Sequence, residues 1–312
     1  MSHKPLVSVL MPVYNAERYV AQAVESILSQ TFKDFEFVIL DDGSKDASLK
    51  ILEEYAAKDR RIHLISRENK GVIRTRNELL AQATGELIAV MDADDVALPN
   101  RFTLQVEFLN ANSNVVCVGG AHELIDEKGR FLTRLLLPEH DNQIQKLALA
   151  GHGSICNPCA MIRRTALIEI GGYDETLACA EDLDVWLKLG EVGALANLKD
   201  TILKYRLLKS SISEKNGVLQ RQAAREICER AWLRRGIEGH FEAEEPWRPT
   251  QDAASQYRFM LQYGWWAFNS GHLGTASLYG TKAIAALPFA AGGWKLLTSS
   301  ALKLLPGVAQ KA

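Results

Sequence analysis

Three aspartates, Asp92, Asp94 and Asp95, crowd into four positions directly after the apolar run Leu87–Met91. Carboxylates this close repel one another unless a cation or hydrogen-bond donors offset their charge. Two aspartates separated by one residue at a strand end suit a hard divalent cation, Mg²⁺ or Mn²⁺, which completes its shell with substrate phosphates and water. An isolated Asp-x-Asp is more often an acidic turn that caps the following helix, so this stretch alone leaves both interpretations open.

Two further polar clusters follow apolar runs nearer the N-terminus. "PVYN" at 12–15 offers Tyr14 for stacking and backbone groups for a nucleobase, and "DDGS" at 41–44 offers Asp42 to accept from a base or ribose. Both clusters consist of residues that also terminate strands and form turns. The chain contains no G-x-G-x-x-G and no G-x-x-x-x-G-K-[ST] motif, so a Rossmann dinucleotide site or a P-loop is unsupported.

Charged residues open two predicted helices farther along the chain. Arg74 and Arg76 lie near the start of a helix over 72–83, where arginine and the helix dipole both favour phosphate. Glu181 and Asp182 begin the helix in "CAEDLDVWLKL", and a carboxylate aimed into a cleft there can act as a general base. The ordinary alternatives are solvated surface arginines and an acidic pair at the N-cap, which the helix dipole favours.

Alternating strand and helix patterns must position these clusters. Strands are predicted at Leu6–Met11, Phe35–Leu40, Ile62–Ile65, Leu87–Met91 and Val115–Gly119, and helices over 16–29, 46–57, 72–83 and 102–109. This order predicts a mostly parallel sheet covered by helices on both faces. Ligands of such sheets bind outside the carboxyl ends of the strands, so the clusters at 12–15, 41–44 and 92–95 are predicted to converge on one rim.

The pattern is mixed after residue 120. We expect a hairpin with Lys128-Gly129 in its turn, helices over 141–150, 181–190 and 215–235, and a strand over 158–162. Residues 240–250 carry charge and two prolines, which is typical of a linker. Residues 251–305 are predicted to form two or three helices rich in Trp, Tyr, Leu and Ala.

Composition excludes several classes of protein. The net charge of −2 gives no basic field for nucleic acid, and no secretory signal or run of 18 apolar residues is found. We therefore expect a cytoplasmic protein. The five scattered cysteines favour reduced, mostly buried thiols, and Cys156-x-x-Cys159 alone is too weak a pattern for a zinc or redox site.

Together and in this order, the motifs resemble the family 2 glycosyltransferases, an inverting group with the GT-A fold. The resemblance covers about residues 5–210 and is carried by "VSVLMPVYNAERYVAQAVESILSQTFKDFEFVILDDGSKDAS", "NKGVIRTRNELLAQATGELIAVMDADDVALPNRF" and "NPCAMIRRTALIEIGGYDETLACAEDLDVWLKL". It predicts a GT-A catalytic domain over 1–215, with a nucleotide-binding half at 1–120 and an acceptor half at 121–215. Residues 216–312 are predicted to be a C-terminal helical region.

The resemblance also implies where the donor binds. In the family, the end of the first strand and the "DDGS" aspartate hold the nucleotide base and ribose. The matching residues here are Pro12, Val13, Tyr14, Asn15, Asp41 and Asp42. Asp94 would bind the metal that bridges the diphosphate, and Asp92 would assist the metal or meet the ribose. Arg76 matches the arginine of the family's "ARN" and would lie near the nucleotide, although "TRN" departs from that motif by one residue.

The catalytic side follows from the same resemblance. Asp182 matches the family's catalytic base, and Glu181 would lie near the acceptor. "GGYD" at 171–174, which contains Tyr173, matches the loop that closes over the donor sugar, and His152 and Asn157 are expected on the acceptor side. A single attack by the deprotonated acceptor hydroxyl would invert the anomeric carbon through an oxocarbenium-like state, with a metal stabilising the leaving diphosphate.

The predicted function is therefore an inverting, metal-dependent hexosyl- or N-acetylhexosaminyltransferase. Its donor would be a nucleotide sugar, most simply a UDP-sugar, and its acceptor a saccharide or lipid-linked saccharide of surface polysaccharide or glycolipid synthesis. One alternative is a sugar-phosphate nucleotidyltransferase, although "PVYNAERY" lacks the expected Gly-rich basic loop. Another is a non-catalytic sugar-nucleotide-binding protein, which intact Asp94 and Asp182 argue against. The C-terminal helices either pack on the catalytic domain or bind the inner face of a membrane peripherally.

Overall fold

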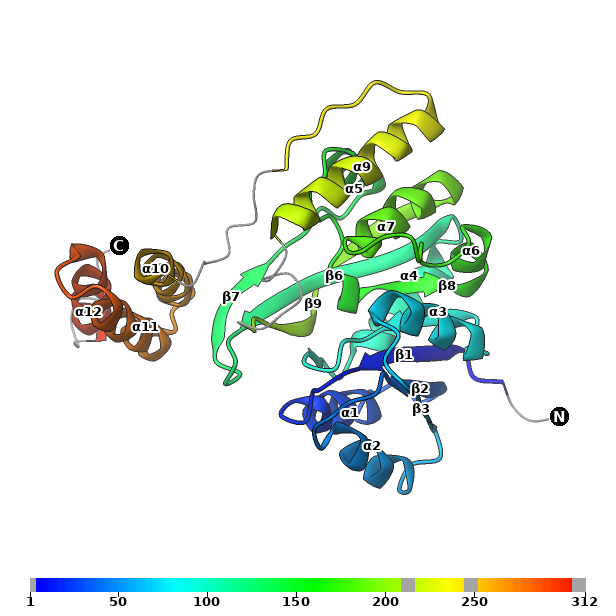
Figure 1. The fold of residues 1–312 in the computed structure, drawn as a ribbon, viewed down its shortest axis with the longest axis horizontal. Helices are drawn as coiled ribbons and strands as arrows, with labels where there is room; N and C mark the ends of the chain where they lie inside the picture. The colour runs from blue at the N-terminus through cyan, green and yellow to red at the C-terminus, as the bar shows by residue number, and fades with distance from the viewer. Residues whose placement is uncertain (1–3, 209–216, 244–251, 305–312) are drawn as a thin grey trace. The chain divides into compact units, whose positions relative to one another are not determined.

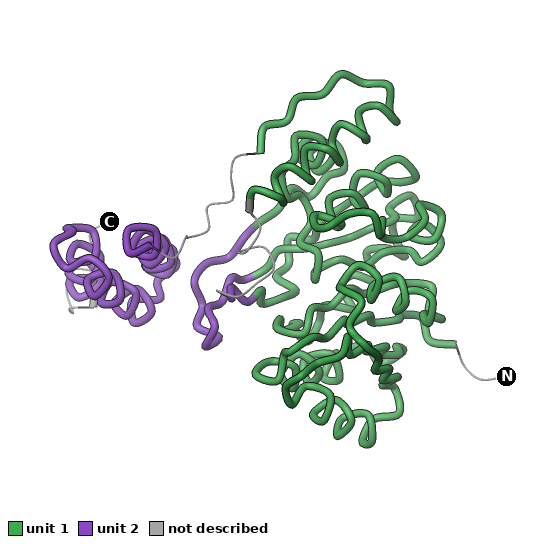
Figure 2. Tube along the Cα trace, viewed as in Figure 1, with its two compact units in different colours: residues 1–122, 136–205, 218–244 green, residues 123–135, 206–217, 245–312 purple. Residues whose placement is uncertain are grey.

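The structure is a computed structural model that describes residues 4–208, 217–243 and 252–304. The chain divides into two compact units (Figure 2). Unit 1 contains residues 1–122, 136–205 and 218–244, and unit 2 contains residues 123–135, 206–217 and 245–312. All the predicted donor, metal and acceptor residues belong to unit 1.

One sheet of nine strands runs through the described residues (Figure 1). The strands are β1 Val7–Val13, β2 Phe35–Asp41, β3 Ile62–Ser66, β4 Leu87–Val90, β5 Val96–Ala97, β6 Val115–Ile125, β7 Phe131–Leu135, β8 Met161–Arg163 and β9 Ala194–Arg206. Their order is β3-β2-β1-β4-β8-β6-β9-β5, with β7 paired to β6. The first four strands along this order are parallel, as predicted, whereas β8 is antiparallel to both β4 and β6.

Helices cover both faces of the sheet in unit 1. They are α1 Val20–Leu28, α2 Ser48–Ala56, α3 Val72–Gln82, α4 Arg101–Ala111, α5 Asp141–Leu149, α6 Arg164–Glu169, α7 Glu181–Val192 and α9 Gly217–Arg235. Apolar side chains of α1, α2 and α4 pack with Val9 and Met11, whereas those of α3, α5, α6 and α7 pack with Leu10. Successive β1 residues thus face opposite layers, which explains why this strand is apolar throughout.

Two departures from the predicted elements have local causes. The strand expected over 158–162 begins only at Met161, because Pro158 lies in a 3₁₀ turn, Asn157–Cys159, before it. The long strand β9 was not predicted, since exposed Lys199 and Asp200 interrupt its apolar residues and remove the alternating pattern.

Helix α9 belongs to unit 1, although its sequence grouped it with the C-terminal helices. Ile227, Cys228 and Ala231 on one face of α9 are fully buried. They share an apolar cluster with Leu183 and Leu187 of α7. Unit 1 therefore continues for one helix beyond the residues that carry the predicted motifs.

Unit 2 combines a hairpin with three helices. The predicted turn is present, with the Gly129 amide donating to the Asp126 carbonyl at 2.8 Å. The helices are α10 Ala253–Asn269, α11 Leu273–Ala286 and α12 Ala291–Leu304. The Tyr279 hydroxyl on α11 donates to the Asp126 carboxylate at 2.9 Å, which ties helix to hairpin.

Two expectations concern the region around unit 2. Within the predicted linker, residues 240–243 have no regular secondary structure, and residues 244–250 lie outside the described residues. Among the helices that the structure describes, none is long and apolar enough to cross a membrane.

Candidate active site

The carboxyl ends of β1, β2 and β4 bring the first three polar clusters to one edge of the sheet. Val13 is in register with Asp41, and the Asp42 amide donates to the Val13 carbonyl at 2.7 Å. On the other side of β1, the Met91 amide donates to the Leu10 carbonyl at 3.0 Å. The parallel register therefore carries residues 12–15, 41–44 and 92–95 to neighbouring strand ends, as the sequence predicts.

Asn15 fastens the first loop to the second. It has a positive φ of 51°, a conformation that Asn tolerates better than most residues. Its amide donates to Ser44 Oγ at 3.0 Å, and its side-chain oxygen accepts from the Lys45 amide at 2.7 Å. Tyr14 beside it remains 51% exposed, so its ring is available for stacking on a ligand.

The two aspartates of "DDGS" are buried and hydrogen-bonded within the protein. Asp42 accepts from the amides of Lys70 and Gly71, at 2.8 and 3.0 Å, and forms an ion pair with Arg67. A carboxylate has about four acceptor positions, so Asp42 retains capacity for one further donor. Asp41 accepts from Ser66 Oγ at 3.0 Å. Both side chains order the loops around the predicted base site whether or not they touch a ligand.

Arg76 lies at the centre of the candidate site. Its side chain is 9% exposed, and its guanidinium lies 3.2 Å from Asp92 and 3.8 Å from Glu181. Burial opposes its charged form, but Asp92 and Glu181 together raise the pKa of Arg76. In the described residues, Nε and Nη1 are buried without a hydrogen-bond partner. Such atoms are expensive to leave unpaired, so they point to a ligand or to an ordered water.

The aspartates at 92–95 differ in their surroundings. Asp92 is partly exposed at its carboxylate, and burial and the charge of Glu181 raise its pKa despite the neighbouring Arg76. Asp94 is also partly exposed, whereas Asp95 is 1% exposed and interacts electrostatically with the buried Arg101. Two accessible carboxylates, Asp92 and Asp94, fit a hard divalent cation that takes its other ligands from diphosphate and water.

Asp182 lies in the first turn of α7, near Glu181 and Arg76. The residue before α7, Ala180, has a left-handed backbone with φ 59°, which is unusual for a residue other than Gly and fixes the entry angle of the helix. Burial, followed by the charge of Glu181, raises the pKa of Asp182 to about 6, while Arg76 opposes the rise. A carboxylate with a pKa near neutrality is suited to accept a proton from a hydroxyl.

Tyr173 is placed over Arg76 by a pair of hydrogen bonds that the sequence did not reveal. Asn77 on α3 donates to the Tyr173 carbonyl at 2.8 Å and accepts from the Tyr173 amide at 2.9 Å. The guanidinium carbon of Arg76 lies 5.6 Å from the centre of the Tyr173 ring. The loop at 171–174 is thereby fixed to the helix that carries Arg76.

The remaining predicted acceptor residues have other neighbours. His152 Nε2 lies 4.0 Å from Glu242 Oε2, in the segment that follows α9. Asn157 opens the 3₁₀ turn, and its side-chain oxygen is buried without a hydrogen-bond partner in the described residues. Neither has a described contact with Asp182, so their roles stay predictions.

Three residues that position the site were missed by sequence reasoning. Arg67 pairs with Asp42 and Glu78, Asn77 holds the loop at 171–174, and Arg101 is fully buried against the Val90 carbonyl at 2.9 Å. Asn77 carried a signal, because Asn is a poor helix former in the middle of a helix. Arg67 and Arg101 had none, since an isolated arginine is usually solvated.

Comparisons with known proteins identify a family and a fold. Residues 8–171 match the family model for glycosyl transferase family 2. A protein of Bacillus subtilis (strain 168) named "Putative glycosyltransferase EpsE" is 36% identical over 211 residues, covering 66% of this chain and 74% of that protein.

Two solved structures share the predicted GT-A fold. Mannosyltransferase PcManGT from Pyrobaculum calidifontis, in complex with GDP-Man and Mn²⁺, is 21% identical with a TM-score of 0.56, covering 98% of this chain and 82% of that one. S. aureus TarS 1-349, in complex with UDP-GlcNAc, is 20% identical with a TM-score of 0.57, covering 90% and 81%. At these identities the likeness establishes the fold alone.

Proposed function

This chain belongs to glycosyltransferase family 2, and on that premise we propose that it transfers a sugar from a nucleotide-sugar donor to an acceptor hydroxyl with inversion of the anomeric carbon. One observation carries the proposal. The Arg76 guanidinium lies 3.2 Å from Asp92 and 3.8 Å from Glu181. The segment after β4 and the start of α7 therefore meet at one buried arginine side chain. The residues that would bind the donor phosphate and the residue that would accept the proton must be neighbours in such a reaction, because the reacting atoms have to be held in contact.

Asp94 and Asp92 are proposed to hold a divalent cation, Mg²⁺ or Mn²⁺, whose charge would stabilise the leaving diphosphate when bound. The partly exposed carboxylates supply the oxygen donors that such ions prefer. Arg76 keeps Asp92 oriented, and its buried Nη1 has no hydrogen-bond partner in the described residues. The related mannosyltransferase fold, solved with Mn²⁺, supports this choice of ion.

Asp182 is the proposed base. It would remove the proton from the acceptor hydroxyl as that oxygen attacks the anomeric carbon from the face opposite the diphosphate. The raised pKa of Asp182 gives its carboxylate enough basicity for this transfer near neutral pH. Because one displacement completes the reaction, no second carboxylate nucleophile is needed.

The donor is proposed to be a hexose or N-acetylhexosamine linked to UDP. Residues 12–15, with Asp41 and Asp42, would receive the base and ribose, and Tyr14 has the exposure that stacking requires. One neighbour in fold was solved with UDP-GlcNAc and another with GDP-Man, so both nucleotides belong in the test.

The acceptor is proposed to be a hydroxyl of a saccharide or lipid-linked saccharide, received between Tyr173, Glu181 and His152. A lipid-linked acceptor would place this cytoplasmic enzyme at the inner face of a membrane. Phe289 and Trp294 are exposed apolar side chains of unit 2 through which a lipid surface would be met. Sedimentation with anionic vesicles, compared between the natural chain and Trp294→Ala, tests that part of the proposal.

The function is tested by a donor panel. The full chain is incubated with Mn²⁺ and UDP-, GDP- or dTDP-sugars, and nucleoside diphosphate release is measured alongside product anomeric configuration by NMR. We expect release that Asp94→Ala abolishes and that Asp200→Asn, at an exposed position of β9, retains. Pyrophosphate release would identify a nucleotidyltransferase instead. Donor binding without turnover would identify a non-catalytic binding protein.

A further inference from the structure

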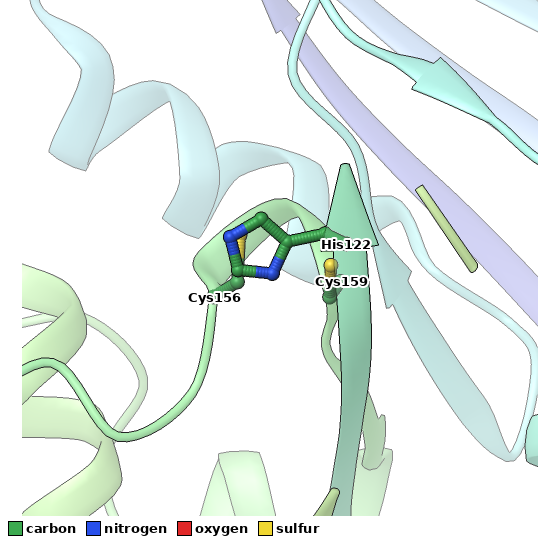
Figure 3. A group of neighbouring side chains, drawn as sticks. All are labelled: His122, Cys156 and Cys159. Atoms are coloured by element: carbon green, nitrogen blue, oxygen red, sulfur yellow. The ribbon is translucent and has the colours of Figure 1, made fainter. Parts of the chain in front are cut away.

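The turn before β8 carries two cysteines that meet a histidine from a neighbouring strand. Cys156 precedes the 3₁₀ turn Asn157–Cys159 and Cys159 ends it, and His122 lies on β6, which pairs with β8 (Figure 3). One ligand atom from each of the three residues lies within 4.8 Å of the others. In the described part of the chain, no other group of three His, Cys, Asp or Glu side chains converges in this way.

Backbone geometry aligns the two sulfurs. Residues three apart in a 3₁₀ turn project on the same side, which places Cys156 and Cys159 together. The Cys159 amide donates to the Cys156 carbonyl at 2.9 Å and closes the turn. Gln105 then donates from one amide nitrogen to the carbonyls of Cys159, at 2.7 Å, and Val118, at 2.9 Å. The turn is therefore held against β6 before any ligand arrives.

His122 supplies an observation independent of the cysteines. The residue is 5% exposed, and its Nδ1 is buried without a hydrogen-bond partner in the described residues. A structural histidine in a core normally satisfies both ring nitrogens. The Tyr205 ring packs edge-on beside the imidazole, with centroids 6.1 Å apart, and restricts its rotation.

The three side chains contact one another without any ion. Cys159 forms hydrogen bonds with both Cys156 and His122. A bound metal would replace these contacts, because it takes the thiolate rather than the thiol.

We propose that His122, Cys156 and Cys159 form a binding site for a thiophilic metal ion of the zinc type, separate from the aspartates at 92–95. Two sulfurs and one imidazole are a donor set that tetrahedral Zn²⁺ accepts, with the fourth position left to water or another ligand. Cys156 is partly exposed and gives the ion a path to the site. The bound ion would link β6 to the turn that leads into β8, the partner of β4.

The test uses the full chain, freed of any affinity tag, reduced and stripped of metal. Zn²⁺ is titrated against a chromophoric chelator, and Co²⁺ is added separately to look for thiolate-to-cobalt charge-transfer absorption. We expect one tightly bound Zn²⁺ per chain and a charge-transfer band. Cys159→Ser and His122→Gln should weaken Zn²⁺ binding at least about tenfold, the scale on which metal sites respond to lost support.

Two controls locate the ion. Cys228→Ser changes another fully buried thiol, whose sulfur donates to the Ala148 carbonyl at 3.5 Å, and should leave affinity unchanged. Asp94→Ala should leave the charge-transfer band intact, which separates this site from the proposed donor site. Circular dichroism of each variant identifies any that does not fold. The Co²⁺ spectrum is measured on the natural chain, so that test holds even if a variant fails to fold.

Several results would overturn the proposal. These are affinity weaker than micromolar in the natural chain, a Co²⁺ complex without thiolate absorption, or equal Zn²⁺ affinity in all variants. A purified chain that lacks zinc and carries a Cys156–Cys159 disulfide under mild oxidant, shown by intact mass and by thiol titration, would identify a redox pair instead. None of these readouts depends on sugar transfer, so failure here leaves the proposed function untouched.

Discussion

Arg76 Nη2 lies 3.2 Å from Asp92 Oδ1, in a pair that joins helix α3 to the end of strand β4. Arg76 is buried and Asp92 is partly exposed, and Glu181 approaches the same guanidinium at 3.8 Å. Removal of that guanidinium would leave both carboxylates without their cationic partner, which is costly for groups that are largely buried. The Arg76–Asp92 pair therefore holds the charged groups of the candidate site in place.

Replacing Arg76 should damage stability and activity together. Arg76→Met leaves Asp92 and Glu181 without their cation, and loss of one partner of a buried pair costs about 3–5 kcal/mol. The free energy of unfolding, measured with urea, should fall by about that amount, and donor turnover should be lost. Arg74→Met is the matched control two residues away, because Arg74 is 59% exposed and its pair with Glu175 should contribute at most about 1 kcal/mol. Equal effects of the two substitutions would contradict the role assigned to Arg76.

The pH dependence of turnover should report Asp182. Its pKa is raised to about 6, and the base must be deprotonated, so kcat/KM should rise with pH through about 6 and then level off. Glu181→Gln removes a negative neighbour that contributes to the raised pKa, so the acid limb should move to lower pH. Glu169→Gln, at an exposed position of α6, should not move it. An acid limb unaffected by Glu181→Gln would show that another group controls the rate.

Metal removal should abolish transfer reversibly. We expect excess EDTA to stop nucleoside diphosphate release, and Mn²⁺ or Mg²⁺ to restore it. The carboxylates of Asp92 and Asp94 are themselves negative, so the cation would have to supply the charge that stabilises the leaving diphosphate. Asp94→Asn should raise the concentration of Mn²⁺ needed for half-maximal rate by about tenfold or more. Full activity after complete chelation, checked by elemental analysis, would rule out the proposed ion.

Adjacent glycines offer a sharper test of the loop at 171–174. Gly171 and Gly172 both have positive φ, 86° and 71°, so alanine at either should cost about 1–2 kcal/mol of backbone strain. Only at Gly172 would the new Cβ also lie 2.8 Å from Asn77 Oδ1, whereas at Gly171 nothing lies within 4 Å. Gly172→Ala should therefore break the Asn77–Tyr173 pairing and reduce turnover well beyond Gly171→Ala. Comparable turnover in two variants of similar unfolding free energy would mean that the pairing does not matter.

Much of the fold followed from local patterns. Apolar runs such as Leu87–Met91 predicted the parallel strands, because strands covered on both faces are apolar throughout. The convergence of residues 12–15, 41–44 and 92–95 followed from parallel order alone. Strand β9 was not predicted because Lys199 and Asp200 interrupt its pattern. Helix α9 was grouped with the C-terminal helices because the sequence of a helix does not reveal which unit it packs on.

The sequence by itself determined the family, the fold and the strand ends where polar residues gather, since spacing and periodicity are local properties of the chain. Tertiary structure decided which of those residues face one another. It buried Arg76 between Asp92 and Glu181, raised the pKa of Asp182, set His152 beside Glu242, and brought His122 to Cys156 and Cys159. Burial, ion pairing and ligand geometry depend on distances between residues remote in the chain, and only packing of the folded layers fixes those distances.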